Sequence, residues 1–142
     1  MRISKIDERK FFAENDPDES WVKIKHLLPG ETSDIFDQVF TQEIDYQKGK
    51  KGKMEPKFSQ KTDKKLDREL TLQSVITGWG NMFDRDDQKM KCTPENIVRA
   101  SREIDGFNEF INECRETLAK DIKEEQADQK KNLTSSVSGP EK

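Results

Sequence analysis

The chain has 142 residues, the length of one ordinary domain. Only 30% of its residues are hydrophobic and 39% are charged, whereas average globular domains have about 45–50% and about 25%. This composition predicts a thin core and argues against an enzyme with a deep pocket. The net charge is −3, but positive charge is concentrated in residues 48–65, which carry 8 basic and 2 acidic groups.

The N-terminal segment, residues 1–28, is predicted to form a β-hairpin. Phe11 and Phe12 precede the sequence Asn-Asp-Pro-Asp at 15–18, whose side chains and fixed proline φ favour chain reversal. Polar and apolar residues then alternate imperfectly between Trp21 and Leu27. Charges are scattered over the first residues and no apolar run of 18 occurs, so neither secretion nor a membrane span is expected.

A first helix is predicted from about Thr32 to Phe40, because apolar residues recur there at helical spacing. Residues 48–57 follow with several lysines, two glycines and one proline, and are predicted to be a flexible basic loop. This loop becomes the tip of a second hairpin if residues 44–47 pair with residues 57–59.

A second helix is predicted from about Thr62 to Phe83, because large apolar residues form one stripe along it, and two glycines weaken its last turn. Thr93, Pro94 and Glu95 have the residue types of an N-cap and first helical turn, so a further helix is expected after Thr93. The stripe of the second helix consists of Leu72, Val75, Ile76, Trp79 and Phe83.

The clearest helix is predicted to begin after Gly106. Its apolar residues form one continuous stripe that ends at Ile122, and charged residues continue to Lys131. Residues 131–142 are rich in polar residues and are predicted to be a disordered tail. The stripe consists of Phe107, Phe110, Ile111, Cys114, Leu118 and Ile122.

The sequence offers little catalytic or metal-binding chemistry. Residues 84–95 imitate a calcium-binding loop, but Lys89 replaces the glycine of the sixth position and Cys92 is a soft ligand at the ninth. An acidic connector with an Asx turn is favoured there. His26 has no partner in sequence that would activate it, and Cys114 lies within an apolar stripe. We therefore predict no enzyme activity, no metal and no cofactor, with both thiols reduced in a cytoplasm.

Two surfaces are candidates for partner binding. The lysines of the basic loop are candidate phosphate contacts, but a single aromatic residue lies near them and the rest of the chain is acidic, so nucleic acid is disfavoured. The chain also has many aromatic residues for a thin core, which favours an apolar face completed by a partner. The candidate phosphate contacts are Lys48, Lys50, Lys51 and Lys53, and the candidate partner-binding residues are Trp79, Phe83, Phe107, Phe110 and Ile111.

Several short motifs together resemble the small tail assembly chaperones of tailed bacteriophages and related small proteins of the tail module. They are Asp-Pro-Asp before Trp-Val-Lys-Ile at 16–24, Pro-Gly-Glu at 29–31, Leu-x-x-x-Ile-x-x-Trp at 72–79, Thr-Pro-Glu-Asn at 93–96 and Gly-Phe-x-x-Phe-Ile at 106–111. The basic segment at 48–57 departs from the family pattern.

This resemblance implies a non-enzymatic protein of the infected or lysogenic bacterial cytoplasm. Such a protein coats the helical tape measure protein until tail tube subunits polymerise around it. The alternative is a structural or adaptor protein of the same tail module, retained in the virion. We expect a mainly α-helical (α+β) domain over residues 1–130 with an N-terminal β-hairpin, able to bind the tape measure or another tail protein, with homo-oligomerisation left open and without membrane contact.

Overall fold

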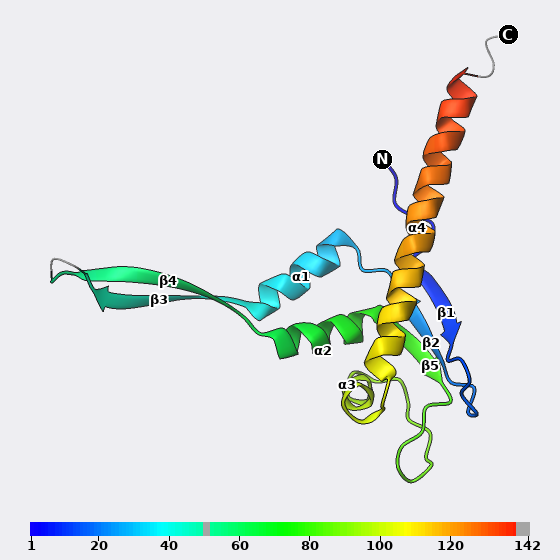
Figure 1. The fold of residues 1–142 in the computed structure, drawn as a ribbon, viewed down its shortest axis with the longest axis horizontal. Coiled ribbons are helices and arrows are strands. Elements are labelled where there is room, and N and C mark those ends of the chain that lie inside the picture. The colour runs from blue at the N-terminus through cyan, green and yellow to red at the C-terminus, as the bar shows by residue number, and fades with distance from the viewer. Residues whose placement is uncertain (50–51, 139–142) are drawn as a thin grey trace. The chain divides into compact units, whose positions relative to one another are not determined.

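The computed structural model describes residues 1–49 and 52–138, and side chains are described for these except at 43 and 131–138. Within this range the chain forms four helices and five strands, the strands arranged as one three-stranded and one two-stranded sheet (Figure 1). The prediction of a mainly α-helical domain is therefore wrong, and the fold is mixed α+β. The chain divides into two compact units, unit 1 (residues 1–27 and 73–142) and unit 2 (residues 28–72).

The sheet of unit 1 has the order β1-β2-β5 and is antiparallel throughout. Strands β1 (Glu8–Phe12) and β2 (Trp21–Lys25) form the predicted N-terminal hairpin. The Asp16 carboxylate accepts hydrogen bonds from the backbone N–H groups of Asp18 and Ser20, at 3.0 and 3.2 Å, which fixes the turn between the strands. On β2, Val22 and Ile24 are both completely buried, because alternate residues of a strand share one face.

Strand β5 (Ile76–Gly80) occupies a segment predicted to be helical. Helix α2 (Lys64–Val75) ends at Val75, and the chain then pairs with β2. The apolar spacing in this segment suits a helix, but pairing with β2 places Trp79 opposite Val22 and completes the sheet. Gly80 lies opposite Trp21, and a Cβ at Gly80 would overlap the Trp21 indole, so this position requires a residue without a side chain.

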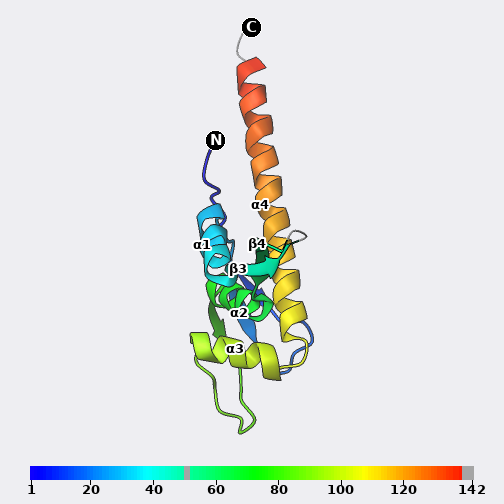
Figure 2. The ribbon, with the colours of Figure 1, turned by 90° about the vertical axis from the view of Figure 1, so that its left-hand side faces the viewer.

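Helices α3 (Pro94–Glu103) and α4 (Phe107–Ser138) form as predicted at their N-terminal ends. The Thr93 hydroxyl accepts a hydrogen bond from the Asn96 N–H at 3.2 Å and caps α3. Gly106 between the helices has φ of +78°, which favours glycine, and α3 crosses the first turns of α4 (Figure 2).

The apolar stripe of α4 packs against the sheet and forms most of the core of unit 1. Its members Phe107, Ile111, Cys114, Leu118 and Ile122 are all buried, as the predicted stripe requires. The helix continues through Ser138, so the predicted disordered tail is wrong for residues 131–138, and residues 139–142 lie outside the described residues.

The N-terminal segment lies along α4. The Glu125 carboxylate accepts hydrogen bonds from the Ser4 hydroxyl at 3.1 Å and from the Lys5 N–H at 3.2 Å. Arg9 of β1 forms an ion pair with Asp121 one helical turn earlier on α4. These contacts are on the surface of unit 1 and add little to its stability compared with the core.

Unit 2 contains helix α1 (Pro29–Val39) and a long hairpin of strands β3 (Phe40–Lys48) and β4 (Met54–Thr62), followed by most of α2. Ile35 and Val39 lie one turn apart on α1 and are buried. The hairpin contains the optional pairing that the sequence left open, with Ile44 opposite Phe58. The prediction of a flexible loop over residues 48–57 is wrong for Lys48, which ends β3, and for residues 54–57, which belong to β4.

Candidate functional site

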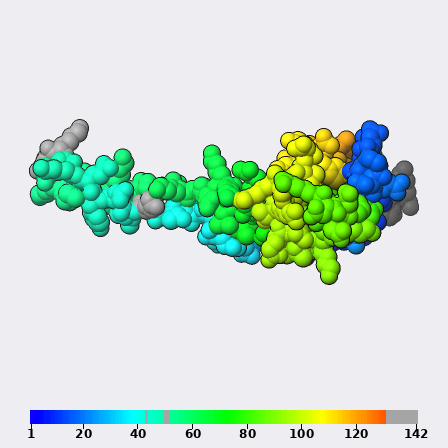
Figure 3. All heavy atoms as spheres, turned by 90° about the horizontal axis from the view of Figure 1, so that it is seen from below, coloured from blue at the N-terminus to red at the C-terminus, as the bar shows by residue number. Residues whose placement is uncertain are grey.

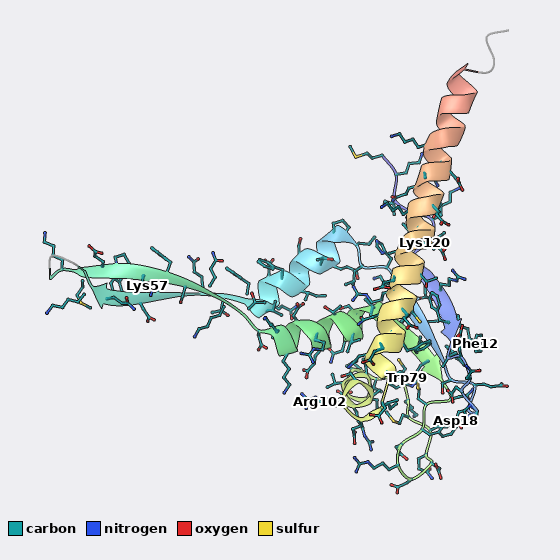
Figure 4. All side chains as sticks on the ribbon, viewed as in Figure 1. Phe12, Asp18, Lys57, Trp79, Arg102 and Lys120 are labelled. Carbon is teal, nitrogen blue, oxygen red and sulfur yellow. The ribbon has the colours of Figure 1, made fainter. Side chains whose placement is uncertain are left out.

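Three of the five predicted partner-binding residues lie inside unit 1. Trp79, Phe107 and Ile111 are 8%, 3% and 0% exposed. The Trp79 indole N–H donates a hydrogen bond to the Met90 carbonyl oxygen at 2.8 Å, and its ring meets the edge of the Phe107 ring at 6.2 Å between centroids. Figure 4 labels Trp79 on β5, next to the first turns of α4. Packing within the fold accounts for these three side chains.

The other two predicted residues, Phe83 and Phe110, are partly exposed and line a pocket of about 350 Å³ in unit 1. This volume is in the range of sites that hold one small ligand or one anchoring side chain. The pocket lies between the β1–β2 turn, the segment after β5 and the start of α4. We call it the acidic-rimmed pocket, and its lining residues are Ala13, Asp16, Asp18, Ser20, Asn81, Met82, Phe83, Ile104, Asp105, Gly106, Phe107 and Phe110.

Three acidic residues, Asp16, Asp18 and Asp105, line this pocket. Hydrogen bonds from Ser20 and from the Asp18 N–H lower the pKa of Asp16, so this side chain is ionised at neutral pH. Figure 4 labels Asp18 on the turn beyond the sheet. A pocket lined by both apolar and acidic residues suits a ligand that combines an apolar group with a neighbouring cation.

A second, smaller depression of about 170 Å³ shares Phe83 and Ile104 with the acidic-rimmed pocket. Arg99 and Glu103 of α3 line it and form an ion pair at 2.7 Å. Phe83 therefore separates two adjacent depressions and is the partly exposed aromatic residue best placed to contact a partner in unit 1.

The β3–β4 hairpin of unit 2 presents an apolar face that sequence reasoning missed. Residues opposite each other in an antiparallel pair share a face, so Ile44 lies beside Phe58, Tyr46 beside Pro56, and Met54 beside Lys48. Large side chains on this face are 52–65% exposed. We call this surface the hairpin face, and it comprises Ile44, Tyr46, Met54, Pro56 and Phe58.

The opposite face of the hairpin is polar, and it includes the Asp45–Lys57 and Gln47–Glu55 pairs. Figure 3 draws the atoms of the hairpin as spheres from one side, and Figure 4 labels Lys57 on β4. A signal for the hairpin face was present in the sequence, because apolar residues occupy every second position from 54 to 58. The proline and the lysines of this segment are also typical of loops, and they favoured a loop over a strand in the sequence-based prediction.

The candidate phosphate contacts are only partly placed by the structure. Lys48 is exposed at the end of β3 and Lys53 is exposed just before β4, whereas Lys50 and Lys51 lie outside the described residues. The phosphate role stays a prediction.

The segment that imitates a calcium loop forms the predicted Asx turn. The Asp84 carboxylate accepts hydrogen bonds from the N–H groups of Asp86 and Gln88 at 2.9 and 3.0 Å. The segment connects β5 to α3, however, and not two helices. Within residues 1–49 and 52–138 no three His, Cys, Asp or Glu side chains come together as metal ligands.

The two cysteines differ in environment. Cys114 is buried in the stripe of α4, and burial together with the neighbouring Glu113 carboxylate raises its pKa to about 11. Cys92 is half-buried, and burial raises its pKa as well. Both thiols are therefore protonated at neutral pH and are poor nucleophiles.

His26 is partly exposed beyond β2, where its backbone N–H donates a hydrogen bond to the Asp7 carbonyl oxygen at 2.6 Å.

Comparison with models of protein families, with curated proteins and with solved structures finds no match. Over the part of the chain that the structure describes, no helix combines the length and the apolar character needed to span a bilayer.

Proposed function

We propose that this protein is a phage tail assembly chaperone that binds the helical tape measure protein, without enzymatic activity, in the bacterial cytoplasm. The observation that carries the proposal is the acidic-rimmed pocket, because two partly exposed aromatic residues and three carboxylates surround one cavity of about 350 Å³. The motif resemblance points to the same class of client.

The pocket fits one anchoring position of a client helix. An apolar side chain enters between Phe83 and Phe110, and a lysine or arginine one turn away meets the carboxylates of Asp18 and Asp105. Apolar burial supplies affinity, and the charge pair selects helices whose apolar stripe is flanked by basic residues.

Affinity at one such pocket is modest, so the proposed mechanism uses many copies along one client. Each bound copy covers a short part of the apolar stripe, and binding along a single chain raises the effective concentration of the next contact. The net charge of −3 per copy makes the coated client repel its neighbours and stay in solution.

Co-expression of this chain with the tape measure protein of the same tail module tests the proposal. We expect the wild-type chain to raise the soluble fraction of the tape measure protein, and Phe83→Ala to lose this effect. Phe12→Ala is the matched control, because Phe12 is 59% exposed on β1 and does not line the pocket. An insoluble tape measure protein unchanged by the wild-type chain contradicts the proposal.

The second candidate function is a structural or adaptor protein of the tail. The hairpin face favours it, since a long strand pair with an exposed apolar face suits permanent contact between subunits. Mass spectrometry of purified virions separates the two functions, because a chaperone is absent from the mature particle and an adaptor is present in stoichiometric amounts.

A further inference from the structure

We propose that two copies of this chain associate through the hairpin face, with the two hairpins antiparallel. Ile44, Tyr46 and Phe58 of one copy pack against the same residues of the other. This inference is independent of the proposed function, because it concerns unit 2 and needs no client.

The hairpin alone lacks a second layer against which its exposed apolar face could pack. Its strands have nine residues each, and one face carries large apolar side chains that are mostly exposed. A two-stranded ribbon in water is marginally stable, whereas two ribbons packed face to face form a four-stranded sandwich with an apolar layer between them. Stacking of a second copy supplies the missing layer.

The charge distribution of unit 2 selects a second copy and the antiparallel arrangement. Residues 28–47 contain five acidic residues and no lysine or arginine, whereas residues 48–53 contain four lysines and no acidic residue. In the antiparallel arrangement Lys48 and Lys53 of each hairpin lie over the base of the other, the end at which β3 follows α1. Asp34 and Asp37 of α1 are exposed next to that base, and α1 has no basic residue in its last turn.

A lysine of the second copy is therefore attracted at this base by the carboxylates of Asp34 and Asp37 and by the negative end of the α1 dipole. A parallel arrangement is disfavoured, because it would place Lys48 and Lys53 of one copy beside the same lysines of the other.

The exposed area is sufficient for a specific interface. At about 200 Å² for each large side chain, Ile44, Tyr46, Met54 and Phe58, which are 52%, 65%, 62% and 60% exposed, offer roughly 480 Å² per copy. When Pro56 and the neighbouring polar residues are included, the surface area buried on the two copies together exceeds roughly 1,000 Å², the lower limit for a specific interface. The stacked rings of Phe36 and Phe40, 5.0 Å apart, extend the apolar surface to α1.

Analytical ultracentrifugation of the purified full chain tests this interface. We expect a monomer–dimer equilibrium with a Kd on the order of 1–100 µM. Tyr46→Lys should raise the Kd at least about tenfold, and Gln47→Lys should change it less than about twofold. Both variants introduce the same charge at exposed, adjacent positions on opposite faces, and Gln47 lies opposite Glu55, so neither is expected to disturb folding.

Two charge-reversed chains test the antiparallel arrangement. Lys48→Glu with Lys53→Glu removes the net positive charge of residues 48–53, and Asp34→Lys with Asp37→Lys reduces the net charge of residues 28–47 from −5 to −1. Each variant alone should dimerise at least about tenfold more weakly than the wild type, and an equimolar mixture should form heterodimers that associate more tightly than either variant alone, because one of their two ends keeps the wild-type charge pair.

Three results would overturn the proposal. The first is a wild-type chain that stays monomeric up to about 1 mM. The second is equal weakening by Tyr46→Lys and Gln47→Lys, which would place the interface elsewhere. The third is Tyr46→Lys that dimerises like the wild type but loses a tail protein, which would assign the hairpin face to that partner.

Discussion

Replacement of Trp79 by phenylalanine tests whether this residue belongs to the core of unit 1 and not to a binding surface. The substitution removes the indole N–H that donates to the buried Met90 carbonyl oxygen at 2.8 Å. A buried acceptor that loses its donor costs about 1–3 kcal/mol. The smaller ring also leaves a void of about 35–40 Å³, which adds about 1 kcal/mol.

The expected loss is therefore about 2–4 kcal/mol in the free energy of unfolding, measured by urea denaturation followed by circular dichroism with an unchanged slope. Phe12→Leu is the control, because Phe12 is mostly exposed and the change should stay within about 0.5 kcal/mol. A Trp79→Phe chain as stable as the wild type would refute the assignment of Trp79 to the core.

Three further predictions concern the stability of unit 1 and use the same urea assay. Gly80→Ala should cost about 1–3 kcal/mol because its Cβ overlaps the Trp21 indole, whereas Gly78→Ala, whose Cβ has its nearest contact at 3.9 Å, should change stability by less than about 0.5 kcal/mol; equal effects would contradict this. Thr93→Ala should cost about 1 kcal/mol through the lost cap of α3, and an unchanged midpoint argues against the cap. The pKa of the Cys114 thiol is about 11 in the folded chain against 9.0 for an unperturbed thiol, so folding favours the protonated form. The contribution of Cys114 to the free energy of unfolding is therefore complete below pH 9 and falls by about 2–3 kcal/mol as the pH rises to about 11. Cys114→Ala should flatten this dependence of the free energy of unfolding on pH.

Local sequence chemistry was sufficient for several elements. The turn at 15–18, the Thr93 cap of α3 and the apolar stripe of α4 depend on residues within one or two turns of each other, and all three are present as predicted. The burial of Cys114 followed from its position in that stripe.

The errors arose where long-range pairing decides the structure. The apolar residues from Leu72 to Phe83 fit a helical stripe, but Ile76–Gly80 pairs with β2, more than 50 residues earlier in the chain. Residues 54–57 look like a loop because of their proline and lysine, yet pairing with β3 makes them a strand with Met54 and Pro56 on one face.

Only part of the candidate site could be predicted from the sequence, because the site joins segments that are distant in the chain. Phe83 and Phe110 were predicted as partner contacts and line the acidic-rimmed pocket. The carboxylates of Asp16 and Asp18 reach the pocket through the β1–β2 hairpin, which is distant in sequence from Phe83. The sequence alone gave no reason to join these two segments.

Titration calorimetry between the tape measure protein and charge-reversed chains tests the central claim most directly. Asp18→Lys with Asp105→Lys reverses two exposed carboxylates of the rim, and Glu116→Lys with Glu124→Lys makes the same change in net charge on α4, away from the pocket. We expect the rim variant to bind at least about tenfold more weakly and the α4 variant to bind like the wild type. Equal binding by both variants would contradict a client site at the acidic-rimmed pocket.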